Sequence, residues 1–275
     1  MSDSKPSAAP LLECAPEEGA RRLALRWIDE ATEAAERVVE GNDDEALHDL
    51  RVALRKLRTV VRTYDGELRG ALAKKRKKKL DRLVQATGAA RDAEVQITWL
   101  EEARGDLEGG AQPGIDWLLE RLREREEAAY AELRATTAPA LLRFLPKVRR
   151  ELARYSTEHV VFETRAPRRF ADTTAKLVRK QAEELASVLR GVRSPDDEER
   201  AHEARKDGKR LRYLLEPLRH EEVAGASEIV KTLKRLQDLL GELNDIAMRS
   251  QLLREEIERA ALERARSLAE RAQAE

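Results

Sequence analysis

Two stretches of the sequence each carry a histidine followed by cations at intervals of three or four residues. These side chains are His48, Arg51, Arg55, Arg58 and Arg62 in the first stretch and His202, Arg205, Lys209 and Arg212 in the second. At about 100° per residue, each set falls along one side of a helix. An oppositely charged pair one turn apart would gain about 0.2–0.5 kcal/mol, yet neither line contains an acid up to Arg58 or Arg212. Such rows of like charge predict an anionic ligand that offsets their repulsion.

The charge of the chain is strongly segregated along the sequence. Residues 48–82 carry a net charge of +9 and residues 147–180 a net charge of +6, whereas the first 47 residues carry −7 and the whole chain is neutral. Arginine offers a planar fork to phosphate oxygens and lysine a mobile point charge. Each charge-assisted hydrogen bond contributes about 1.5–3 kcal/mol. The ligand class that these features favour is therefore a multiply charged anion.

The cation rows belong to an internal repeat. The segment HDLRVALRKLR (48–58) matches HEARKDGKRLR (202–212) at an offset of 154 residues. The segment LDRLVQATGAARDAEV (80–95) matches LKRLQDLLGELNDIAM (233–248) at an offset of 153. Two matches in the same order and at nearly the same separation indicate two homologous halves.

The composition indicates that these halves are helical. Charged residues make up 39% of the 275 residues and aromatic residues 4%, and the abundant Ala, Leu, Glu and Arg are strong helix formers. Apolar residues at helical spacing predict helices over about 16–40, 44–65, 69–104, 115–136, 170–190, 197–219 and 226–272, with a further stretch reaching about 155. Residues 1–15, which include Pro6 and Pro10, are predicted to be a disordered tail. Short connections predict antiparallel neighbours packed in bundles, so the fold class is all-α.

The repeated motifs resemble the CHAD domain, a family named for conserved histidines and α-helices. The resemblance rests on H-x-x-R-x-x-x-(R/K)-(R/K)-L-R, present twice, and on GAARDAEV (88–95) and GELNDIAM (241–248). It covers about 16–275, with a first half over about 16–136 and a second over about 137–275. The resemblance implies two four-helix bundles related by a pseudo-two-fold axis, with a basic groove or pore between them.

The same resemblance implies that the groove binds inorganic polyphosphate and that the protein is associated with polyphosphate granules in the cytoplasm. The implied binding residues are His48, Arg51, Arg55, Arg58, Lys75, Lys78, Lys79, Arg82, His202, Arg205, Lys209, Arg212, Lys231, Lys234 and Arg235. The second motif departs from the family pattern at Lys206-Asp207-Gly208, where it has an acid and a helix-weakening glycine. No E-x-E-x-K signature of the often fused CYTH domain is present, so a stand-alone CHAD protein is expected.

Three other functions are weighed against this one. A metal site at the histidines is disfavoured because neither has a second His or Cys one turn away and because the arginines would repel a cation. Catalysis is disfavoured because Asp92 and Asp245 are the only repeated acids and no phosphate-binding loop motif is present. Nucleic-acid binding, the main alternative, would satisfy the same cations, but ten aromatic residues leave few for base stacking. We therefore expect a non-enzymatic protein with neither metal nor cofactor.

The remaining features concern partners and location. A helical scaffold without an anion ligand stays open as an alternative, and the leucines and alternating Glu and Arg of the final helix suit a surface helix or a homodimer seam. One cysteine, Cys14, excludes an internal disulfide. No apolar run approaches the roughly 20 residues of a membrane span, and no signal-peptide pattern is present. The expected location is the cytoplasm, away from membranes.

Overall fold

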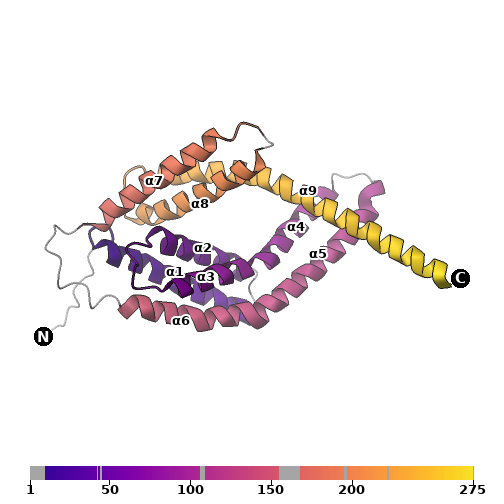
Figure 1. Ribbon diagram of the computed structural model, residues 1–275, viewed down its shortest axis with the longest axis horizontal. Coiled ribbons are helices and arrows are strands. Elements are labelled where there is room, and N and C mark those ends of the chain that lie inside the picture. The colour runs from indigo at the N-terminus through magenta and orange to yellow at the C-terminus, as the bar shows by residue number, and fades with distance from the viewer. Residues whose placement is uncertain are drawn as a thin grey trace.

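A computed structural model describes residues 10–41, 43, 45–105, 109–154, 168–194, 197–221 and 223–274. Throughout these ranges the regular structure is helical, as the sequence predicts (Figure 1). The helices are α1 (Pro16–Glu40), α2 (Ala46–Thr63), α3 (Lys74–Ala86), α4 (Gly88–Arg104), η1 (Gly109–Ala111), α5 (Gln112–Glu132), η2 (Leu133–Thr137), α6 (Ala138–Arg154), α7 (Phe170–Arg190), α8 (Glu198–His220) and α9 (Ala226–Ala274).

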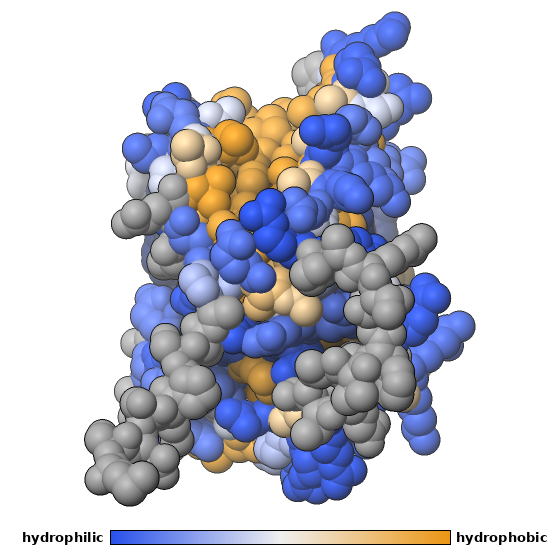
Figure 2. Space-filling view, turned by 90° about the vertical axis from the view of Figure 1, so that its left-hand side faces the viewer, coloured by the Kyte–Doolittle hydropathy of each residue, from blue (hydrophilic) through white to orange (hydrophobic). Residues whose placement is uncertain are grey.

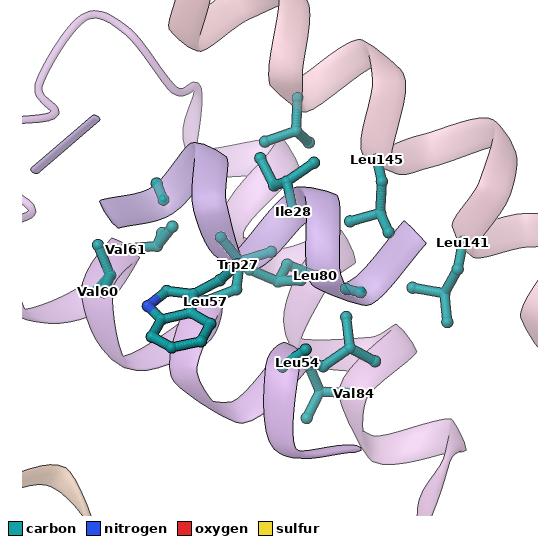
Figure 3. Close-up of a cluster of buried hydrophobic side chains, with 14 of the residues drawn as sticks. Trp27, Ile28, Leu54, Leu57, Val60, Val61, Leu80, Val84, Leu141 and Leu145 are labelled. Atoms are coloured by element: carbon teal, nitrogen blue, oxygen red, sulfur yellow. The ribbon is translucent and has the colours of Figure 1, made fainter. Parts of the chain in front are cut away.

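The largest hydrophobic core lies between α1, α2, α3 and α6 (Figure 1). Alanines on the buried face of α1, among them Ala24 and Ala31, let α2 approach closely. Leucines of α2 and α6 fill the space around Trp27 and Ile28 (Figure 3). Because α2 buries one face in this core, its cation row is left at the edge of the bundle.

A second core is formed by α7, α8 and the first half of α9. Leu211, Leu215 and Leu218 of α8 pack against Val230, Leu233 and neighbouring residues of α9. Within the described ranges the buried residues of this core come from three helices, whereas those of the first core come mainly from α1, α2, α3 and α6, with single residues from α4, η2, α7 and α8. The expectation of two four-helix bundles is therefore not confirmed.

A third, smaller core lies in an arm made by α4, α5 and the second half of α9, on the right in Figure 1. Leu252 of α9 meets leucines and isoleucines of α4 and α5 there. Glu256, also on α9, is 2% exposed and pairs with Arg121 and Arg125 of α5. The opposite face of α9 carries exposed apolar residues such as Leu239, Ile246 and Ile257. The homodimer seam on this helix stays a prediction.

Phe170, at the start of α7, anchors this helix in the first core, and Leu185 near its other end lies in the second. Its side chain is fully buried and its ring lies 5.2 Å from that of Tyr64, whose hydroxyl is 2.9 Å from the Thr174 hydroxyl. A Cβ added to Gly19 would lie 2.3 Å from Phe170 Cγ, so only a glycine lets α1 pass beneath this ring. Figure 2 shows this end of the molecule, where apolar side chains gather in the upper half.

The predicted tail over residues 1–15 is wrong for residues 10–15. The Cys14 carbonyl accepts a hydrogen bond from the Phe170 amide at 2.8 Å, and the Leu12 carbonyl accepts one from the Ala171 amide at 3.0 Å. Cys14 is buried, because this segment covers the Phe170 joint. Residues 1–9 lie outside the described ranges.

Two element boundaries also differ from the prediction. The single helix expected over 69–104 is broken at Thr87 into α3 and α4, because the Thr87 carbonyl turns away to accept a hydrogen bond from Arg51. The helix expected over 115–136 continues through the π-helical turn η2 into α6. Since α6 packs on α1 in the first core, the expected division near residues 136 and 137 does not coincide with a boundary between the cores.

Candidate anion-binding site

A cavity of about 430 Å³ opens between α2, α4, α8 and α9, a size within the usual range of ligand sites. It is lined by His48, Arg51, Val52, Arg55, Arg91, Asp92, Val95, Gln96, His202, Arg205, Lys209, Asn244, Asp245, Met248 and Arg249. Six of these were predicted from the two histidine motifs: His48, Arg51, Arg55, His202, Arg205 and Lys209. Residues about 154 positions apart in the chain therefore share one cavity.

Nearly every residue of the cavity wall has a counterpart at the repeat spacing. The pairs are His48 with His202, Arg51 with Arg205, Arg55 with Lys209, Arg91 with Asn244, Asp92 with Asp245, Val95 with Met248 and Gln96 with Arg249. A Cβ on Gly88 would lie 3.8 Å from Arg51 Nη1, and a Cβ on Gly241 would lie 3.8 Å from Arg205 Nε. The repeated glycines therefore lie beside the repeated arginines, and the cavity has corresponding walls.

The two repeated arginines nevertheless differ in their partners. Arg51 is 9% exposed, donates a hydrogen bond from Nη1 to the Thr87 carbonyl and lies 3.7 Å from Asp92. Arg205 has a buried Nε without a hydrogen-bond partner in the described part of the chain. Arg51 therefore holds the α3–α4 break in place, whereas Arg205 lines the cavity with its guanidinium not committed to such a backbone contact.

Replacing Arg51 with alanine is expected to destabilise the protein by about 1–3 kcal/mol, since the buried Thr87 carbonyl loses its donor. Urea unfolding followed by circular dichroism measures this loss. Arg205→Ala is the matched control: its unpartnered Nε strands no acceptor, so we expect a loss below about 1 kcal/mol. Equal losses in the two variants would contradict the assignment of different roles.

Arg55 and Lys209 add uncompensated charge to the cavity wall. Neither side chain makes an ion pair within the described ranges. Burial, aided by Arg205, Arg55 and Arg212, lowers the pKa of Lys209 to about 7, and Asp245 opposes this only weakly. Lys209 is therefore held in a position where its protonated form is costly unless an anion is close.

The two histidines occupy corresponding positions at the cavity wall but differ in exposure. His202 is partly buried and its Nδ1 lies 2.7 Å from Asn244 Oδ1. His48 is exposed. Because an amide oxygen can only accept, Nδ1 of His202 donates in this contact. The other ring nitrogen, Nε2, is left for a further partner.

The far ends of the cation rows leave the cavity. Arg58 and Arg62 pair with Asp81 of α3 at 3.2 and 2.9 Å. Arg212 donates from Nη1 to Glu216 at 2.6 Å and from Nε to Gln237 at 3.0 Å. Arg58 and Arg212, which were predicted as binding residues, are therefore already partnered and do not line the cavity.

The predicted binding residues on α3 and α9 also lie outside the cavity wall. Lys75, Lys78, Lys79 and Arg82 are exposed on α3, and the Lys79 ammonium lies over the Phe144 ring of α6 at 5.4 Å. The exposed residues on α9 are Lys231, Lys234 and Arg235. None of these seven residues is among those that line the cavity.

Sequence reasoning missed two cations of the cavity wall, Arg91 and Arg249. Arg91 lies just before Asp92, and Arg249 lies one turn after Asp245, over the Trp99 ring at 5.0 Å. The available signal was the spacing from the repeated glycine, which places residues three, four, seven and eight positions later on one face of each helix. Applying this spacing to both halves would have found them.

A larger cavity of about 700 Å³ lies between the α1–α2 connection, α4 and α5 but has the wrong charge for an anion. Its wall contains Asp43, Glu45, Glu94, Glu126 and Glu127 against two arginines.

In the part of the chain described, no group of three or more His, Cys, Asp or Glu side chains is placed to hold a metal ion. Among the same residues, no helix has the length and apolar character that crossing a bilayer requires.

Comparison with known protein families identifies the family of this chain. The family model described as "CHAD domain" matches residues 22–254. The chain belongs to the CHAD domain family. A similar solved structure is the crystal structure of the CHAD domain from the plant Ricinus communis, with a TM-score of 0.70 and 22% sequence identity over 93% of this chain and 85% of that one. At this identity the likeness supports the CHAD fold alone. A search of curated proteins gives no match.

Proposed function

We propose that this CHAD protein binds inorganic polyphosphate, without hydrolysing it, in the cavity between α2 and α8. The observation that carries the proposal is that Arg55, Arg205 and Lys209 line one cavity with no carboxylate paired to them in the described ranges. Unpaired cations at close quarters are costly in the free protein. Phosphate oxygens would offset this cost with charge-assisted hydrogen bonds.

The shape of the cation rows favours a linear polyanion over a single phosphate. Residue numbers rise in the same direction along both rows, since Lys56 pairs with Glu216 beyond the cavity that holds His48 and His202. α2 and α8 therefore run in parallel, with cations on both sides of the space between them. Successive phosphates of one chain can contact successive cations, and each linked contact adds affinity without a new association cost.

We propose binding without hydrolysis because each acid of the cavity lies near a cation of its own half. Asp92 lies 3.7 Å from Arg51, and the negative charge of Asp245 slightly favours the protonated form of Lys209. These carboxylates orient cations in this proposal and hold no reacting group. The CHAD family's association with polyphosphate-related proteins also supports this function, and a location in the cytoplasm at polyphosphate granules is part of the proposal.

Calorimetric titration with long-chain polyphosphate, triphosphate and duplex DNA at physiological salt tests the function. We expect heat of binding with polyphosphate, weaker binding of triphosphate, and no displacement of polyphosphate by DNA at equal charge. DNA that competes equally would favour the alternative, a general polyanion surface. No binding of any of the three would leave a helical scaffold.

The affinity for polyphosphate is expected to fall as the pH rises above about 7. In the free protein Lys209 loses its proton near this pH, whereas a bound anion favours the charged form and raises the pKa of Lys209. Binding between these two pKa values must therefore take up a proton. Titration at pH 8 in buffers of different ionisation enthalpy measures this uptake, and Lys209→Arg, which stays charged, should abolish most of it. Proton release, or an uptake unchanged in Lys209→Arg, would contradict the assignment.

A further inference from the structure

The outer ends of the two cation rows, the ends away from the cavity, differ in the sign of one charge. Arg62 ends the first row, whereas the residue at the same repeat position in the second row is Glu216. The Glu216 side chain is only 15% exposed and lies 2.9 Å from Lys56 Nζ. It also accepts the hydrogen bond from Arg212 Nη1. One half-buried carboxylate therefore holds a cation from each of α2 and α8.

Glu216 takes the place that a phosphate oxygen would need at this end. Arg212 gives its remaining contact, from Nε, to Gln237, so it has little left to offer a ligand. A carboxylate fixed on the same helix competes at high effective concentration with any anion from solution. On the α3 side Asp81 does the same for Arg58 and Arg62, but these pairs are more exposed and contribute less.

The cavity end has the opposite balance. Arg55, Arg205 and Lys209 have no carboxylate at ion-pair distance among the residues described. The charge of the two rows is therefore uncompensated at the cavity and neutralised at the outer end, about two helical turns away. A bound polyanion meets strong attraction in the cavity and an internal competitor beyond it.

We propose that Glu216, assisted by Asp81, is a specificity-determining residue that ends the phosphate-binding track, the part of the two cation rows that contacts a bound polyphosphate. It confines tight contact to the cavity, so that the site holds a short run of phosphates even when the bound chain is long. This inference rests on the proposed function. It concerns how far along the rows a bound polyphosphate makes contact.

Glu216→Gln tests the inference by removing the carboxylate charge while keeping the shape of the side chain. We expect the affinity for long-chain polyphosphate to rise about fivefold or more, since Lys56 and Arg212 become available. The affinity for triphosphate, which is short enough to stay in the cavity, should change less than twofold. The salt dependence of long-chain binding should become steeper, because more cations are neutralised on binding.

Glu203→Gln is the matched control for the change in net charge. Glu203 is exposed on the same helix, about 120° around it from Lys209. We expect its substitution to alter the affinity for either ligand less than twofold. A gain in Glu216→Gln no larger than that in Glu203→Gln would overturn the inference.

The outcomes separate the inference from the proposed function. A wild-type chain that binds no long-chain polyphosphate overturns both, whereas wild-type binding without a long-chain gain in Glu216→Gln overturns the inference alone. Circular dichroism checks that each variant is folded. If Glu216→Gln is not, Asp81→Asn frees Arg58 and Arg62 at the same end. A long-chain gain in that variant supports the track end, and its absence overturns it.

Discussion

The double variant Arg205→Ala/Lys209→Ala is expected to bind long-chain polyphosphate at least about 100-fold more weakly than the wild-type chain. Each charge-assisted hydrogen bond lost costs about 1.5–3 kcal/mol, and every 1.4 kcal/mol is tenfold in affinity. Arg205 Nε has no partner in the described structure and Lys209 makes no ion pair there. The fold should therefore persist, and calorimetry at fixed salt measures the loss.

Lys75→Ala/Lys78→Ala is the control, because it removes the same charge from exposed positions on α3 outside the cavity wall. We expect its affinity to stay within about threefold of the wild-type value. An equal loss in both double variants would mean that binding is spread over the basic surface. Paired Arg→Glu changes at Arg51 and Arg205 are a poorer test, since a glutamate at position 51 would face the buried Thr87 carbonyl.

Phe170→Ala is expected to lower the free energy of unfolding by about 3–5 kcal/mol, the usual cost of deleting a buried aromatic ring. Phe170 is fully buried between Gly19 and Tyr64, so its loss opens a void at the joint between the first two cores. For a domain of this size the melting temperature should fall by roughly 10 °C. Thermal unfolding followed by circular dichroism measures both.

Gly19→Ala supplies the coupled control for Phe170. In the wild-type background the new methyl group would meet the Phe170 ring, and overpacking of this kind costs about 1–3 kcal/mol. In the Phe170→Ala background the same change meets no ring and should be close to neutral. Additive losses would show that the ring does not set the approach of α1.

The sequence predicted the site well where the repeat fixed the register. His48 and His202 belong to one motif on homologous helices, so a pseudo-symmetric packing brings both to the same cavity despite 154 intervening positions. Arg91 lies within the matched segment but pairs with Asn244, and Arg249 lies one residue past it and pairs with Gln96, so the repeat keeps no cation at either position. Their place in the cavity wall depends on how α4 and α9 are rotated about their axes. That rotation is set by packing in the arm, around Leu252.

The lysines of α3 and the helix break show what local sequence does not contain. The run KKRKKK (74–79) covers every side of a helix, since successive residues are about 100° apart. Only the fold shows that Lys79 lies over Phe144 of α6 while Leu80 and Val84 of α3 pack into the first core. The break at Thr87 depends on a hydrogen bond from Arg51, 36 residues earlier. Neither fact follows from helix propensity, since both are tertiary contacts.

The arm has a consequence for the energetics of binding. α4 and α9 both form walls of the cavity and then continue into the arm, where Leu252 and the buried Glu256 link α9 to α5. The walls are thus braced beyond the cavity, and widening it would mean breaking an apolar cluster and a buried ion pair. The backbone and side chains of the site therefore lose their conformational entropy when the protein folds, before any ligand binds. A flexible polyphosphate would meet a preorganised receptor, so the ordering cost of association would fall almost entirely on the ligand.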